Sequence, residues 1–115
     1  MKLNLFWKDT QNNIYKLGTL YKIGKIFNFD IYEDTLKQAI KHGCFGIGNF
    51  NFLKNHYESP ELFDFFKERI PSENDPFINN WLSTYNLDKY DELELLKATK
   101  GYLPIDRYFI EEELS

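Results

Sequence analysis

Residues 14–32 read IYKLGTLYKIGKIFNFDIY, and this stretch decides the first half of the fold. Gly24 separates two runs that are rich in isoleucine, tyrosine and phenylalanine, as expected for a tight turn between two strands. After the turn, Phe27 and Phe29 alternate with polar residues, which predicts a strand with one face buried. We therefore predict a β-hairpin across this stretch.

The segments on either side extend this hairpin. The short apolar run LNLFWKD (3–9) predicts an earlier strand, and the polar cluster DTQNN (9–13) predicts the turn that follows it. The first three strands therefore form an antiparallel meander. EDTLKQAIKHG (33–43) predicts a short helix that buries Leu36, Ala39 and Ile40, with Gly43 as its left-handed C-terminal residue.

The second half predicts helices. Ser59 followed by Pro60 is a typical helix start, and it predicts a helix over 59–70. Asp75 followed by Pro76 repeats this start signal and predicts a helix over 75–87. Asp88 predicts the start of a third helix that ends near Gly101, followed by a last strand LPIDRYFI and a solvated acidic tail. We therefore expect an α+β domain: a small antiparallel meander sheet packed by three to four helices.

The composition narrows the class of protein. The chain has 115 residues, a net charge of −4 and an aromatic content of 18%. This length fits a single domain, 1–115, with its own hydrophobic core. The negative charge disfavours direct binding to nucleic acid, which needs a basic surface. With no signal peptide, no membrane-length apolar run and one cysteine, Cys44, we expect a cytoplasmic protein and a buried thiol.

Few residues indicate catalysis. His42 and His56 have no partners at the spacing of a metal site or a catalytic triad. We predict His42 at a helix end and His56 in a loop. The segment CFGIGNFNF (44–52) lacks the lysine and the following helix of a phosphate-binding loop, so we predict a strand or an irregular extended segment with turn and bulge glycines. We expect a protein without enzymatic activity, metal or cofactor.

Three segments, in this order, resemble the N-terminal subdomain of HipA-type kinases. YKLGTLYKIGKIFNFDIYEDTL (15–36) is similar to that family's glycine-leucine strand, phenylalanine-rich strand and tyrosine. LFDFFKERIP (62–71) is similar to its phenylalanine-rich helix, which ends in a Leu-Leu-Pro signature. YDELELLKATKGYLPIDRYFI (90–110) is similar to the segment that leads into the kinase core. The resemblance covers most of the chain, over 5–110.

The chain differs from the family pattern in three places. Arg69-Ile70 stands where the family has Leu-Leu, and Ser72-Glu73 replaces the glycine after the proline. Ile105-Asp106-Arg107 replaces the small residues that close the last segment. The motifs of a protein kinase core are also missing from the sequence.

A chain with this subdomain and no kinase core is similar to the HipS antitoxins of bacterial tripartite HipBST toxin–antitoxin systems. The resemblance implies a fold like the HipA N-terminal subdomain. It also implies an antitoxin that binds and inhibits a HipT/HipA-like serine/threonine kinase toxin. The complex would include a DNA-binding HipB-like repressor, and the chain itself would contact neither nucleic acid nor membrane.

Aromatic residues are the candidate contacts for such a partner. In the helix predicted over 75–87, Trp81 lies near the edge of the apolar stripe and, with Phe77 and Tyr85, can reach a partner pocket. The alternative is that Trp81 belongs to the core, since an apolar helical stripe usually faces the core. Phe65 lies off the stripe of its own predicted helix, so it is a further candidate for a ring covered by a partner.

The sequence is also compatible with four other functions. The chain can be the N-terminal regulatory segment of a HipA-type kinase without its catalytic core, or a small non-catalytic interaction module. An enzyme that uses dispersed carboxylates would show acidic groups with shifted pKa values in a pocket. A nucleic-acid adaptor would show a positive stripe on its surface.

Overall fold

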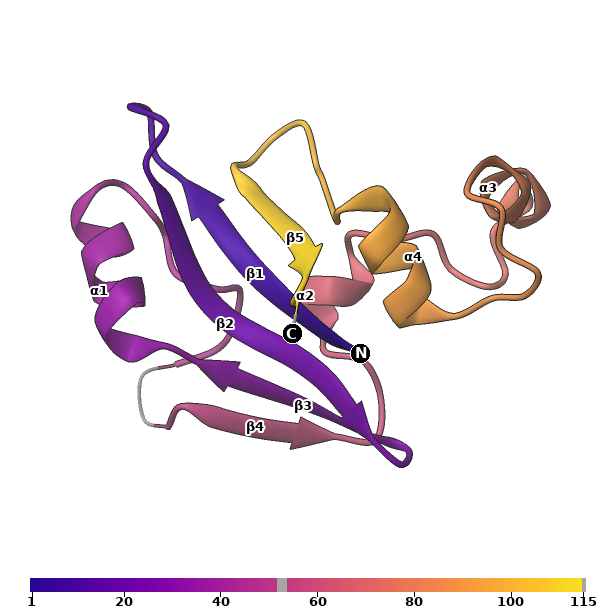
Figure 1. The fold of residues 1–115 in the computed structure, drawn as a ribbon, viewed down its shortest axis with the longest axis horizontal. Coiled ribbons are helices and arrows are strands. Elements are labelled where there is room, and N and C mark those ends of the chain that lie inside the picture. The colour runs from indigo at the N-terminus through magenta and orange to yellow at the C-terminus, as the bar shows by residue number, and fades with distance from the viewer. Residues whose placement is uncertain (52–53, 115) are drawn as a thin grey trace.

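The computed structural model describes residues 1–51 and 54–114. In these residues a five-stranded antiparallel sheet, in the order β4-β3-β2-β1-β5, is combined with four helices (Figure 1). The strands are β1 (Lys2–Lys8), β2 (Ile14–Ile23), β3 (Ile26–Ile31), β4 (His56–Ser59) and β5 (Tyr108–Glu112). The helices are α1 (Glu33–Lys41), α2 (Asp64–Lys67), α3 (Ile78–Thr84) and α4 (Glu92–Thr99). The α+β class and the opening meander are confirmed.

The two turns of the meander have clear local causes. At the β1–β2 turn, the buried carboxylate of Asp9 accepts the backbone N–H groups of Gln11 and Asn13, each at 2.9 Å, and the hydroxyl of Tyr15 at 3.1 Å. At the β2–β3 turn, Gly24 has a φ of +58°, a conformation that glycine adopts without steric cost. The predicted hairpin is therefore confirmed.

A bulge in β2 adjusts the register of the sheet. Leu5 pairs with Gly18 but Phe6 pairs with Lys16, so Leu17 is an extra residue on its strand, and its side chain is fully buried. At Gly18 the neighbouring strand comes so close that a Cβ would lie 2.4 Å from the backbone oxygen of Asp30. Glycine at this position is therefore required by the contact between two strands.

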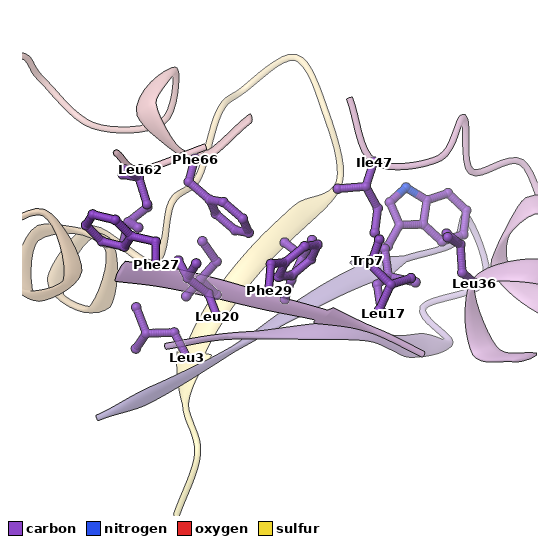
Figure 2. Close-up of a cluster of buried hydrophobic side chains, with 14 of the residues drawn as sticks. Leu3, Trp7, Leu17, Leu20, Phe27, Phe29, Leu36, Ile47, Leu62 and Phe66 are labelled. Carbon is purple, nitrogen blue, oxygen red and sulfur yellow. The ribbon is translucent and has the colours of Figure 1, made fainter. Parts of the chain in front are cut away.

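The hydrophobic core lies between the sheet and the helical segments, as Figure 2 shows. Phe29 of β3 is fully buried, and its ring meets the edge of the Phe66 ring of α2 at a centroid distance of 5.1 Å. Leu36 and Ala39 of α1 are buried at one end of this core, but Ile40 is 37% exposed, contrary to our prediction. The predicted polar face of β3 is also partly wrong, since Asn28 is buried.

The segment before α2 differs most from the sequence prediction. Ser59 does not begin a helix; it ends β4, a strand that the sequence analysis missed. Its hydroxyl accepts the backbone N–H of Glu61 at 3.1 Å, which makes a turn. Because Phe63 is still extended, with ψ of 143°, α2 begins only at Asp64. The helix predicted over 59–70 is therefore reduced to four residues.

The last two elements are also shifted along the chain. α4 begins after Asp91, not Asp88, because the Asp91 side chain accepts the backbone N–H of Glu94 at 3.0 Å. Lys100 takes the left-handed position at the end of α4. β5 begins at Tyr108, later than predicted, and continues into the acidic run that we had expected to be a solvated tail.

Candidate partner-binding site

α3 lies at one end of the molecule, away from the sheet (Figure 1). None of its residues is buried, whereas α1, α2 and α4 each contribute buried side chains. The apolar side chains of α3 are therefore not packed into the core of this domain, whereas the other three helices each place side chains in it.

Local signals set the limits of α3. The carboxylate of Asp75 accepts the backbone N–H of Phe77 at 2.7 Å, and the helix begins at the next residue, Ile78. Asn86 has a φ of +61°, so the chain has left the helical conformation by that residue. The helix predicted over 75–87 is present in the shorter form Ile78–Thr84.

Three aromatic residues form one row along α3, which we call the α3 aromatic row: Phe77, Trp81 and Tyr85. Their spacing of four residues places them on the same side of the helix. The rings of Trp81 and Tyr85 are stacked with centroids 6.1 Å apart and planes inclined by 23°. Together with Asn80 and Thr84 they line a shallow groove of about 300 Å³.

The alternative that Trp81 belongs to the core is wrong. Trp81 is 38% exposed, Phe77 is 64% exposed, and neither is part of the core cluster. The core is formed by side chains of the sheet, α1, α2 and α4, among them the fully buried Leu95 and Leu96 of α4. The usual rule for apolar stripes fails for α3 because this helix is not packed on the sheet.

Phe65, the fourth predicted contact, lies elsewhere. It is on α2, well separated from α3 in Figure 1. Its half-buried ring meets Phe66 at 5.3 Å and Tyr108 at 5.1 Å, both nearly at right angles. The structure thus brings together three of the four predicted residues and places Phe65 on a different surface.

An ion pair that no sequence pattern indicated joins the chain just after α2 to the segment before β5. The buried Arg69 guanidinium contacts the Asp106 carboxylate at 2.5 Å and donates to the backbone oxygen of Gly101 at 2.8 Å. It also lies over the rings of Phe65 and Tyr108, at 4.5 and 5.0 Å from their centroids. Two of the three departures from the HipA pattern, Arg69 and Asp106, are therefore each other's partner.

The two histidines have different environments. His42 caps the end of α1, as predicted, with Nδ1 2.9 Å from the backbone oxygen of Gln38. His56 lies in β4, not in a loop, and its Nδ1 is 2.6 Å from the carboxylate of its cross-strand partner Asp30. The hydrogen bond to Asp30 raises the pKa of His56, although burial opposes this. A second carboxylate, Glu58, lies 3.5 Å from Nε2.

The glycine-rich segment after α1 is irregular over 44–51, so the irregular alternative of our prediction is confirmed there and the strand alternative is wrong; Phe52 lies outside the described residues. Gly46 and Gly48 have φ values of +89° and +51°. The turn role is confirmed for Gly48, which lies in a turn closed by the hydrogen bond from the backbone N–H of Phe50 to the backbone oxygen of Ile47. Cys44 is buried, as expected. The Tyr108 hydroxyl donates to the backbone oxygen of Gly46, and burial raises the pKa of this tyrosine. This bond ties the segment to β5.

Comparisons of the chain with protein family models, curated proteins and solved structures give no match. Within residues 1–51 and 54–114, no helix combines the length and the apolar character needed to cross a membrane. The same residues contain no group of three or more histidine, cysteine or acidic side chains that could hold a metal ion.

Proposed function

We propose that this chain is a HipS-like antitoxin, which binds a cognate HipT/HipA-like serine/threonine kinase toxin and inhibits it. In this proposal a HipB-like DNA-binding repressor completes the complex, and the chain itself acts in the cytoplasm without catalytic activity or cofactor. The sequence resemblance over 5–110 supports the choice of partner. The single structural observation that supports a binding role is the α3 aromatic row.

The α3 aromatic row has the properties of an interface anchor. Tryptophan and tyrosine are enriched among the residues that contribute most to binding, because they bury large areas at a small entropic cost. A helix presented away from its own core can enter a groove on a partner as a single apolar ridge. We propose that Trp81, flanked by Phe77 and Tyr85, enters the active-site cleft of the kinase and blocks it.

The fold class is compatible with a HipA N-terminal-subdomain-like fold, which we propose as the finer assignment. Arg69 and Asp106 differ from the family pattern but bind each other inside this chain. Their pairing explains how both departures can occur together without leaving a buried charge unpaired. The alternative proposal is a regulatory N-terminal segment of a HipA-type kinase, in which the same row would contact a kinase core in cis.

Co-expression with a HipA-like kinase encoded beside this gene tests the proposal. One protein carries an affinity tag, and complex formation, kinase activity and growth are measured. We expect a stable complex and suppressed kinase activity. Trp81→Ala should weaken the complex at least tenfold, which corresponds to about 1.4 kcal/mol and is modest for an anchoring tryptophan. It should also restore toxicity.

Two controls make the result specific. Phe45→Ala removes an aromatic ring that is completely exposed on another surface, and it should leave binding unchanged. Thermal unfolding should show that Trp81→Ala costs less than about 1 kcal/mol of stability, because α3 has no buried residue. A complex that survives Trp81→Ala but not Phe45→Ala would refute the assignment to α3. Failure of the two proteins to associate would refute the antitoxin proposal itself.

A further inference from the structure

A second surface feature, separate from the α3 aromatic row, is a pocket of about 430 Å³ between α2 and the glycine-rich segment that follows α1. Four aromatic residues line it, namely Phe50, Tyr57, Phe63 and Phe65. Their rings hold each other in place, since Phe50 meets Tyr57 at 4.8 Å and Phe63 at 5.4 Å, both edge to face. The walls are therefore supported by contacts within the chain.

Two carboxylates complete the lining of this pocket. Asp64 and Glu68 are four residues apart along α2, so they project from the same side of the helix. Both are exposed. Within the part of the chain that the structure describes, neither side chain makes an ion pair or a hydrogen bond. The pocket thus combines four aromatic rings with two carboxylates that make no ion pair. One of these rings already carries a cation, since the Lys54 ammonium lies over Tyr57 at 4.8 Å from its centroid.

The same chain shows which group fits such a combination. Arg69 lies over the rings of Phe65 and Tyr108 while its guanidinium binds the carboxylate of Asp106. A planar guanidinium can stack on aromatic faces and bind carboxylates at the same time, which an ammonium does less well. Arg69 itself does not line the pocket, although Phe65 contributes to both sites. The pocket therefore has the components of the Arg69 site without a guanidinium of its own.

We propose that this pocket binds an arginine side chain presented by a protein partner. The guanidinium stacks against the aromatic walls and pairs with Asp64 and Glu68 at the rim. The net charge of −4 favours the approach of a basic segment over long range. The proposal does not depend on the identity of the kinase partner, because it concerns the chemistry of one side chain and can be tested on the isolated chain.

The test is an NMR titration of the ¹⁵N-labelled chain with N-acetyl-arginine amide. N-acetyl-citrulline amide, which has nearly the same shape but no charge, and N-acetyl-lysine amide serve as comparison probes. We expect saturable shifts at the backbone amides of Gly48, Asn49 and Glu68. Citrulline should bind about tenfold more weakly or worse, since the charge-assisted hydrogen bonds are lost. Lysine should also bind more weakly than arginine.

Variants of exposed acidic residues locate the binding site. The double variant Asp64→Asn, Glu68→Gln should lose about tenfold in arginine affinity. Glu61→Gln is the matched control, because Glu61 precedes α2 but does not line the pocket. Equal binding of citrulline or lysine would overturn the arginine assignment. Shifts that do not saturate, or an affinity unchanged in the double variant, would overturn the pocket as the site.

Discussion

Replacing Asp106 with asparagine should strongly destabilise this small domain. In the structure, the Asp106 carboxylate accepts from Arg69 through both of its oxygens, at 2.5 and 3.3 Å. The Arg69 side chain is only 3% exposed, whereas that of Asp106 is 23% exposed. The variant keeps the size of the side chain but removes its charge. The buried guanidinium would then keep only neutral acceptors, the backbone oxygen of Gly101 and the single amide oxygen of the asparagine, with no negative charge beside it.

The expected magnitude follows from this burial. Removing one partner of a buried ion pair costs about 3–5 kcal/mol, because the other charge is left uncompensated. Since water can reach Asp106, we expect the lower end, about 3 kcal/mol. For a chain of 115 residues the unfolding entropy then gives a decrease in melting temperature of about 12 °C. A loss of about 3 kcal/mol is a large part of the free energy of unfolding of a typical domain, which is about 5–15 kcal/mol.

Urea and thermal unfolding followed by circular dichroism would measure this loss. Asp88→Asn is the control, since Asp88 is exposed, and it should change stability by less than about 0.5 kcal/mol. Adding Arg69→Met to the Asp106 variant should recover at least about 1 kcal/mol, because it removes the unpaired buried charge. If Asp106→Asn were no more destabilising than the control, the argument from burial would be refuted.

Three further predictions follow from other contacts. The imidazole of His56 should titrate above pH 6.5 in an NMR titration, and Asp30→Asn should lower its pKa, because the hydrogen bond to Asp30 raises it. The contribution of protonated His56 to stability is complete below pH 6.5 and is lost as the pH rises through the folded-state pKa. Gly18→Ala should cost about 3 kcal/mol in urea unfolding because its Cβ meets a backbone oxygen, whereas Gly24→Ala, in open space but at positive φ, should cost about 1 kcal/mol. Phe66→Ala should cost about 4 kcal/mol in the same assay, and a loss below 1 kcal/mol would contradict its place at the centre of the core.

Local patterns in the sequence determined the opening meander and the existence of most helices. The turn at Gly24, the polar cluster after β1 and the apolar spacing of α1 act over a few residues, so they can be recognised without the rest of the chain. The boundaries were less accurate where two start signals compete. Asp88 and Asp91 are both suitable helix caps, and only the tertiary position of α4 selects Asp91.

The tertiary structure alone decided which apolar surfaces are covered. The aromatic spacing of α3 is as regular as that of a core helix, and the sequence cannot show that this helix lies away from the sheet. Arg69 and Asp106 are 37 residues apart, and their pairing depends on how the chain after α2 meets the segment before β5. Periodicity reports that a helix has an apolar face; whether that face meets the core or solvent depends on long-range packing, which no short segment contains.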